Sequence, residues 1–267
     1  MRGERAASIV LQAADGPLHV PIRIPEPEMR LADLATIAYA LTEAVADRSA
    51  RQNLRDGRSI TCRAGCGACC RQLVPISAPE ALLLADAIDP SDERDRTARL
   101  QRFAVVEATL APHGLPARLA QSHGSADALR LIANAYFARG VACPFLVDES
   151  CSIHPLRPVA CRSYSVTSPA AWCSEPSTHR FDLLPMPPHL SVPLARVAAT
   201  LTDEAVAPIA LSLLGPWLRG HAELRWRTWP SETLLSRFLA EMGAWPERPG
   251  LAGDGAAVLV DDGGGAR

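Results

Sequence analysis

Cys62-Arg-Ala-Gly-Cys66-Gly-Ala-Cys69-Cys70 is the stretch that organises this chain, because it holds four of the eight cysteines in one short run. Gly65 and Gly67 disfavour a regular helix here. We therefore expect a loosened turn around Cys66 that leads into a short helical turn at Cys69. Neighbouring side chains on a helical turn diverge by about 100°. The adjacent thiols of Cys69 and Cys70 are therefore expected to serve two metal ions, or to bridge the ions of one cluster.

A second block carries the remaining thiols, on Cys143, Cys151, Cys161 and Cys173. All eight cysteines lie in the two blocks, and none lies in a segment with a clear helical pattern. We expect the blocks to converge in space, because scattered free thiols would be open to oxidation. Eight thiols are enough for two tetrahedral sites, or for one cluster with thiols to spare. The segment from Cys143 to His154 is predicted to form a tight hairpin, with Asp148-Glu-Ser150 at its turn.

Length and composition favour metal binding over disulfide bonds. The chain has 267 residues, of which 48% are hydrophobic and 21% charged, as in ordinary globular proteins. No apolar run approaches the roughly 20 residues that span a bilayer, and the apolar run Ala6 to Val10 is too short for a signal peptide. We therefore expect a cytoplasmic protein with reduced cysteines. The net charge of −2 indicates no general affinity for nucleic acid or membrane, and the partner is unknown.

Hydrophobic periodicity predicts a mainly α fold with a short N-terminal β-hairpin, a central metal-organised cysteine knuckle and a second small hairpin. A turn signal at Asp15-Gly16 separates the two N-terminal strands. Ser77-Ala-Pro79-Glu80 has the pattern of a capping box at the start of a helix. The predicted strands are Ala7 to Gln12 and Leu18 to Ile24. The predicted helices are Arg30 to Arg55, Glu80 to Ile88, Ser91 to Ala111, Ser125 to Arg139, Leu190 to Ala207, Pro208 to Arg227 and Ser231 to Met242.

Composition divides the chain into four parts. Residues 1–29 form the N-terminal hairpin, and residues 30–184 form a cysteine-cluster domain with a helical insert at 78–140. Pro185, Pro187 and Pro188 mark a linker, after which the helices of residues 185–242 are expected to pack on the same domain. Residues 243–267 are rich in glycine and are predicted to be a flexible tail.

The two blocks together resemble a known family. The chain reads Cys62-x3-Cys66-x2-Cys69-Cys70, then Cys143-Pro-Phe-Leu, then Cys151-Ser-Ile-His154-x2-Arg157-Pro158-x2-Cys161-Arg162-x-Tyr164. This pattern is similar to that of the YkgJ-like cysteine-cluster proteins, which are zinc- or iron-chelating domains. The resemblance covers about Thr61 to Cys173. It implies that the cysteines chelate a metal, and it implies no particular reaction.

Two positions depart from that family. Three residues separate Cys62 from Cys66, where the family often has two, and His154 stands where family members usually have tyrosine. The imidazole of His154 could coordinate the metal or donate a hydrogen bond to sulfur. Alternatively, it is a plain replacement of the tyrosine ring by another ring. Arg157 and Arg162 flank Cys161. They could balance thiolate charge, or pair with Asp148 or Glu149 at the surface.

The sequence leaves the metal and the function class open. Both zinc and iron–sulfur clusters accept four-thiolate ligation, whereas hard cations do not favour sulfur. The first function is a metal-binding module that holds zinc or iron through up to eight cysteines. The second is an iron–sulfur enzyme for redox or methyl-group transfer, because flagellin lysine methylases carry a similar cysteine block. The third is an interaction module that the metal merely stabilises.

Overall fold

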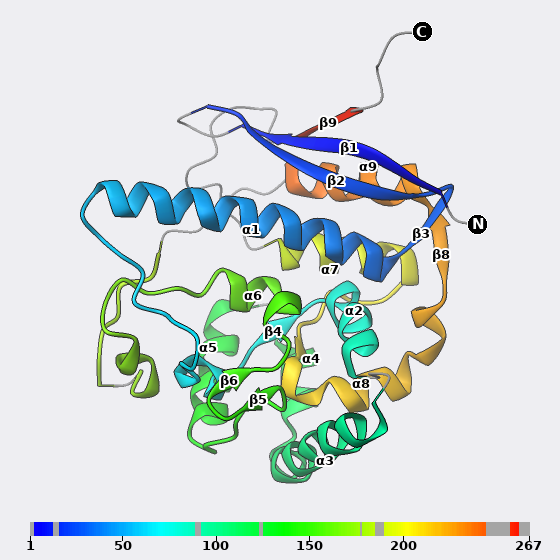
Figure 1. The fold of residues 1–267 in the computed structure, drawn as a ribbon. Helices are drawn as coiled ribbons and strands as arrows, with labels where there is room; N and C mark the ends of the chain where they lie inside the picture. Colours follow the sequence, from blue (N-terminus) through cyan, green and yellow to red (C-terminus); the bar gives the residue numbers. More distant parts are fainter. Residues whose placement is uncertain are drawn as a thin grey trace, which may run out of the picture.

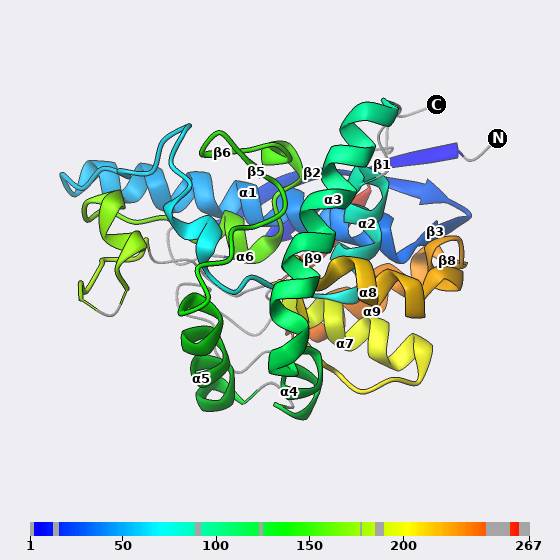
Figure 2. The same cartoon turned by 90° about the horizontal axis from the view of Figure 1, so that it is seen from below.

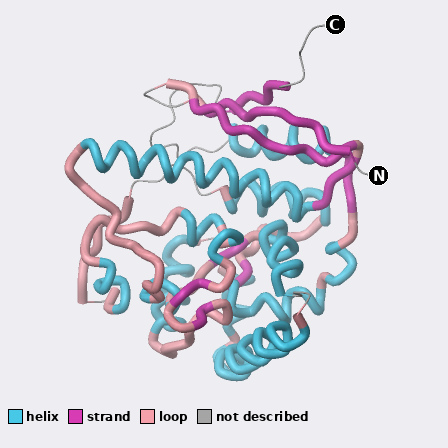
Figure 3. The backbone as a smooth tube through the Cα atoms, in the orientation of Figure 1, coloured by secondary structure: helices cyan, strands magenta, loops and turns pink. Residues whose placement is uncertain are grey.

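The computed structural model describes residues 3–12, 16–88, 92–122, 125–176, 178–184, 190–243 and 257–261. These residues form a mainly α structure with small antiparallel sheets, as the sequence predicts (Figures 1 and 3). The described helices are α1 (Leu31–Arg55), α2 (Ala78–Ile88), α3 (Glu93–Leu110), α4 (Leu115–Gln121), α5 (Ala126–Phe137), α6 (Val159–Arg162), α7 (Ser191–Thr202), α8 (Leu214–Gly220) and α9 (Ser231–Gly243).

Strands and short 3-10 turns connect these helices. The strands are β1 (Gly3–Leu11), β2 (Leu18–Glu26), β3 (Glu28–Arg30), β4 (Pro75–Ile76), β5 (Leu146–Val147), β6 (Ser150–Cys151), β7 (Ile209–Ala210), β8 (Thr228–Pro230) and β9 (Ala257–Asp261). The 3-10 turns are η1 (Ala68–Arg71), η2 (Ala111–His113), η3 (His154–Leu156), η4 (Ala170–Ser174), η5 (Leu211–Leu213) and η6 (Ala222–Arg225). Among the described residues, no helix is long and apolar enough to cross a membrane.

The N-terminal hairpin is confirmed. β1 and β2 pair in antiparallel register from Gly3 opposite Glu26 to Leu11 opposite Leu18, while part of their predicted turn lies outside the described residues. The prediction of a flexible tail is wrong for Ala257–Asp261, which forms β9 and pairs with β1. Its run Ala-Val-Leu-Val is β-branched and apolar enough to extend the sheet. The rest of that tail lies outside the described residues.

The long first helix is confirmed, and it lies between the sheet and the rest of the chain (Figure 1). One apolar face of α1, including Leu34, Ala38 and Leu41, is fully buried. The core that contains this face also takes side chains from β1, β2, α7 and α9. The hairpin and the C-terminal helices therefore share one core with α1.

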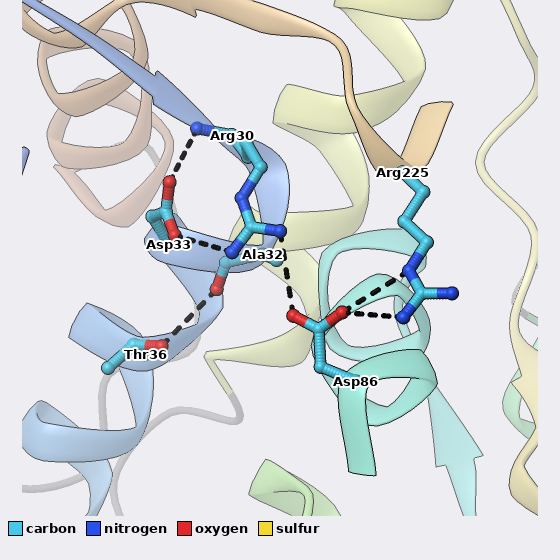
Figure 4. A network of polar contacts seen from close by, with 6 residues as sticks. All are labelled: Arg30, Ala32, Asp33, Thr36, Asp86 and Arg225. Atoms are coloured by element: carbon cyan, nitrogen blue, oxygen red, sulfur yellow. Dashed lines mark hydrogen bonds and ion pairs between the residues drawn. The ribbon is translucent and has the colours of Figure 1, made fainter. Parts of the chain in front are cut away.

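A network of charged side chains joins the start of α1 to two other elements (Figure 4). Arg30 bonds to Asp33 through its backbone N–H at 2.7 Å and its guanidinium at 3.2 Å, and reaches Asp86 of α2 at 3.5 Å. Arg225 of η6 approaches the same Asp86 carboxylate at 3.2 and 3.0 Å. Thr36 donates to the Ala32 carbonyl within α1. Asp86, which lies in the helical insert, thus links the insert to the start of α1 and to η6.

Two helix predictions need correction. α4 was not expected, because Pro112 and Gly114 looked like the end of a helix. Gly114 has a φ of +57° and caps α4 instead, with Pro116 in the first turn. The helix predicted over Pro208 to Arg227 begins as β7, because Ile209 pairs with Ile76 of β4 and only later does the chain turn into α8. The predicted linker at Pro185 to Pro188 lies outside the described residues.

Candidate metal centre

The first cysteine block forms the predicted loosened turn. Gly65 has a φ of +80°, a left-handed value that favours glycine, and the N–H of Cys66 donates to the carbonyl of Arg63. The chain then enters η1, where the Cys70 N–H donates to the Gly67 carbonyl at 3.0 Å. The sequence Ala68–Arg71 therefore makes one tight helical turn that carries the adjacent thiols.

The second block begins with the predicted hairpin. β5 and β6 pair through Leu146 opposite Cys151. Asp148 and Glu149 have φ values of 49° and 57°, as a tight two-residue hairpin turn requires. The Leu146 N–H donates to the Cys143 carbonyl at 2.9 Å, which folds Cys143 back toward the hairpin. In Figure 2 this hairpin and α6, the helix that carries Cys161, lie on the same side of α3.

Backbone and side-chain hydrogen bonds bring the two blocks together, as expected. The Cys143 N–H donates to the Cys70 carbonyl at 2.7 Å. The Gln72 amide donates to the carbonyl of Cys173 at 3.1 Å, and the Val166 N–H lies 3.5 Å from the Cys62 sulfur. The convergence inferred from the distribution of cysteines is therefore present in the fold itself.

All eight cysteines are free thiols. Burial, followed by neighbouring thiolate charge that includes Cys69, raises the pKa of Cys62, Cys143, Cys151, Cys161 and Cys173. The pKa of Cys143 rises to about 12 and that of Cys173 to about 11. Several thiols therefore share one electrostatic neighbourhood, and each thiolate makes the next harder to form.

Cys69 itself is the exception. A hydrogen bond from the Cys70 thiol lowers the pKa of Cys69 to about 7, burial opposes this, and the charge of Arg157 assists it. The same hydrogen bond, with burial, raises the pKa of Cys70. At neutral pH Cys69 is therefore partly a thiolate while Cys70 keeps its proton. Thiolates are the form that binds metal.

The donor set fits a soft metal, although the thiols must move to ligate it. Among the described residues, no three His, Cys, Asp or Glu side chains lie in position to hold one ion together. Thiolates suit zinc and iron. Two buried tyrosine hydroxyls, Tyr39 Oη and Tyr164 Oη, lack a well-formed hydrogen bond, and cysteine charge acts on both. A buried hydroxyl calls for a hydrogen-bond partner, and a thiolate of the centre is one group that could supply it.

A buried carboxylate positions the helix that carries Cys161. Glu80 is fully buried, and its carboxylate accepts hydrogen bonds from the Val159 N–H at 2.8 Å, the Ser77 N–H at 2.8 Å and the Ser77 hydroxyl at 2.7 Å. Burial raises the pKa of Glu80, and these hydrogen bonds oppose the increase. Of the predicted capping box, the bond from the Ser77 N–H to the Glu80 carboxylate is present. The same carboxylate also reaches the first residue of α6, a role that the sequence did not reveal.

Arg162 anchors the same segment to α1. Its Nε donates to the Arg157 carbonyl at 2.7 Å, its guanidinium pairs with Glu43, and it lies 4.7 Å from the centre of the Tyr39 ring. Arg162 therefore does not make the surface pair with Asp148 or Glu149. Arg157 instead takes the charge-balancing role, because its charge lowers the pKa of Cys69, Cys151 and Cys161.

Sequence reasoning missed the arginine that pairs with Glu149. Arg71 contacts both carboxylate oxygens of Glu149, at 3.0 and 2.6 Å, and the Gly67 carbonyl at 3.0 Å. Glu149 lies so close to Gly67 that an added Cβ would be 2.4 Å from its Oε2 atom. The pair closes the hairpin onto the first block. The signal available in the sequence was the position of Arg71, a cationic residue directly after Cys70.

His154 lies at the surface. Its side chain is exposed, and its pKa is lowered by desolvation and by the charge of Arg157. Cys173, in contrast, is buried at 3% exposure on η4. The structure therefore places Cys173 in the interior and His154 at the surface.

An open hollow of about 440 Å³ lies against the first block. Cys66 is the cysteine that lines it, next to the guanidinium of Arg63 and the carboxylate of Glu149. The complete lining is Thr61, Arg63, Gly65, Cys66, Gly67, Ala68, Glu149, Pro169, Ala170, Ala171 and Ser174. One edge of the thiol centre is thus accessible to small molecules.

Residues 61–179 match the model of the CxxCxxCC family, described as "Putative zinc- or iron-chelating domain". This segment is therefore similar to the CxxCxxCC family. The match spans both cysteine blocks and the insert between them, and it confirms the family predicted from the cysteine pattern. Searches of curated proteins and of solved structures gave no match. The match supports metal binding in general and names no single metal.

Proposed function

We propose that the CxxCxxCC domain binds zinc or iron through its thiols. The ligands are drawn from Cys62, Cys66, Cys69, Cys70, Cys143, Cys151, Cys161 and Cys173. The observation that carries this proposal is the convergence of both blocks, fixed by the hydrogen bond from the Cys143 N–H to the Cys70 carbonyl. Soft thiolates at this density suit zinc or iron far better than hard cations.

The chain's own residues prepare the centre for a metal. Cys69 offers the first thiolate near neutral pH, and Arg157 offsets the accumulating negative charge. Glu80 and Arg162 hold α6, and so Cys161, against α2 and α1. When bound, zinc would crosslink the two blocks, and an iron–sulfur cluster would add electron transfer.

A second candidate is an iron–sulfur enzyme of the redox or methyl-transfer kind. The hollow at Cys66 favours it, because a closed structural site needs no space for a second molecule. Arg63, Glu149 and Ser174 give that hollow polar groups that could orient a substrate. We propose the metal-binding module as the main function, because binding of a metal is enough to explain why the thiols are gathered.

Elemental analysis tests the proposal directly. The protein should be purified anaerobically from the cytoplasmic fraction, where we propose it resides, without a metal-affinity tag, and its visible spectrum recorded. Stoichiometric zinc without colour would support a structural or storage role. Iron with acid-labile sulfide and visible absorption would support the enzyme. A protein with no metal would contradict both.

A matched pair of variants links the metal to the thiols. Cys69→Ser should lower metal content and the melting temperature, because metal binding and folding are coupled. Ala104→Ser, at an exposed position of α3, should leave both unchanged. Equal metal content in the Cys69→Ser variant would contradict ligation by the Cys69 thiol.

A further inference from the structure

A second hollow, of about 380 Å³, is lined by residues of α4, α7, β7 and α8. Among the described residues, no cysteine lines it, so it is distinct from the hollow at Cys66. Its lining is mostly apolar: seven of the described lining residues are alanines, and Leu119, Ile209 and Leu213 are buried there. A hollow of this size with an apolar lining is typical of sites that bind small molecules.

The local sequence explains why space is left at this place. Ala195, Ala198, Ala199 and Thr202 recur at helical spacing on α7, so they form one face of that helix, and all four line the hollow. After α7, residues 204–208 run without helix or strand to β7, and they line the hollow as well. The small side chains on both segments leave room that larger apolar side chains would fill.

Among the described lining residues, His221 and Glu204 carry the ionisable groups. The Nδ1 atom of His221 lies 2.8 Å from the carbonyl oxygen of Trp217. A carbonyl oxygen only accepts, so Nδ1 carries the proton of this hydrogen bond, and Nε2 of the neutral ring is an acceptor. The imidazole also stacks on the Trp217 ring, with centroids 4.3 Å apart and an interplanar angle of 11°. The direction of Nε2 is therefore fixed.

His221 Nε2 lies 3.5 Å from Oε1 of Glu204. This distance is longer than a usual hydrogen bond of about 2.7 to 3.2 Å. In the neutral form of His221, two acceptors thus face each other without a proton to join them. A donor placed beside both atoms would satisfy both, and a cationic donor would also be attracted to the Glu204 carboxylate. The side chains of His221 and Glu204 are 26% and 46% exposed, so a ligand can reach them from solvent.

We propose that this second hollow binds a small amphiphilic amine. The apolar part of the amine occupies the alanine-lined space, and its ammonium group donates hydrogen bonds to Glu204 Oε1 and His221 Nε2. An alcohol of the same length supplies a donor without the charge. A carboxylate supplies no donor and is repelled by Glu204. This site needs neither the thiols nor a metal, so the inference goes beyond the proposed function and stands separately from it.

Isothermal titration calorimetry on the full chain tests the class of ligand. The probes are n-octylammonium, 1-octanol and octanoate, which share one chain length and differ in the head group. Octylammonium should bind one molecule per chain with a dissociation constant of about 1 mM or lower. 1-Octanol should bind more weakly, and octanoate most weakly. Octylammonium that fails to saturate, or octanoate that binds as tightly, would overturn the proposal.

A matched pair of variants locates the ammonium group. Glu204→Gln should weaken octylammonium binding by about fivefold, the contribution of a partly exposed ion pair, and should leave 1-octanol binding unchanged. Glu223→Gln removes the same charge from an exposed position that does not line the hollow, and it should change neither affinity. Equal weakening by both variants, or by neither, would overturn the assignment of the head group to Glu204.

Two further variants locate the apolar part. Ala199→Leu places a larger side chain in the hollow and should abolish binding of octylammonium and 1-octanol, with the melting temperature as the check on folding. Trp217→Phe keeps an aromatic ring beside His221. It should retain the heat of binding but remove the change in tryptophan fluorescence that octylammonium causes in the wild type. Full binding by a folded Ala199→Leu variant, or a fluorescence change that Trp217→Phe leaves intact, would place the amine elsewhere and overturn the proposal.

Discussion

The backbone N–H of Cys143 donates a hydrogen bond to the carbonyl oxygen of Cys70, with an N···O distance of 2.7 Å. The bond joins two cysteine blocks that α2, α3, α4 and α5 separate in sequence. It uses backbone atoms alone, so it leaves both thiols free for a metal. The blocks are therefore held close to each other by the fold before any ligand bond forms.

Glu80 should be essential for the stability of this arrangement. Glu80→Gln keeps the size of the side chain but leaves only one acceptor oxygen for the donors of Ser77 and Val159. A buried donor without a partner costs about 1 to 3 kcal/mol. We expect the free energy of unfolding of the metal-free protein to fall by that amount in urea denaturation. Glu223→Gln, at an exposed position, is the matched control and should change nothing.

The same carboxyl should give the fold a measurable pH dependence. Burial raises the pKa of Glu80 above 4.5, so the folded state holds this proton more tightly than the unfolded state. Its contribution to stability is therefore fully present below pH 4.5 and is lost as the pH rises through the folded pKa. The stability of wild type relative to Glu80→Gln should accordingly decrease as the pH rises from 4.5. A pH-independent difference would contradict a raised pKa.

Gly67→Ala should separate the hairpin from the first block. The new Cβ would lie 2.4 Å from Glu149 Oε2 and 2.9 Å from Leu146 Cδ1. The Oε2 atom is at the flexible end of the Glu149 side chain, so the carboxylate should swing away and lose its ion pair with Arg71. We expect a loss of about 1 kcal/mol in unfolding free energy, typical of overpacking by one methyl group.

A double-mutant cycle identifies the cause of that loss. If the clash with Glu149 is responsible, Gly67→Ala should cost less in a Glu149→Ala background than in the wild type. Gly220→Ala, where an added Cβ meets nothing within 4 Å, is the control. Equal costs in both backgrounds would show that Leu146 or the backbone, and not the ion pair, carries the effect.

Arg162→Lys should be far from conservative. The guanidinium bonds to the Arg157 carbonyl, pairs with Glu43 and lies over Tyr39. An ammonium group cannot fill this planar fork. Loss of these partly buried contacts should destabilise the protein by about 1 kcal/mol in thermal or urea unfolding. Arg58→Lys, whose ion pair with Asp56 is exposed, should lie within experimental error of wild type.

The sequence predicted the periodic parts of the molecule and the identity of its thiol cluster. α1 and the first hairpin follow from clear patterns of period 3.6 and period 2. The error over β7 arose because Ile209 pairs with Ile76, a contact between distant segments that a local pattern does not contain. The contacts of Tyr39 with Arg162 and of Glu80 with Val159 were missed for the same reason, because the two residues of each pair are far apart in sequence. Which thiols come together depends on which loops approach each other, and the spacing of the cysteines alone leaves this open.

The ionisation of Cys69 can be measured in the metal-free, reduced protein. The Cys70 thiol donates a hydrogen bond that lowers the pKa of Cys69 to about 7, against about 8.5 for a free cysteine. Since the thiolate is the nucleophile, alkylation of Cys69 by iodoacetamide should reach half of its maximal rate near pH 7. Cys70→Ala removes the donor and should shift that midpoint upward. Cys143, whose pKa is about 12, should stay unreactive over the same range. A Cys69 midpoint near 8.5 in the wild type, or one that Cys70→Ala leaves unchanged, would contradict a thiol pair in which Cys70 holds the proton for Cys69.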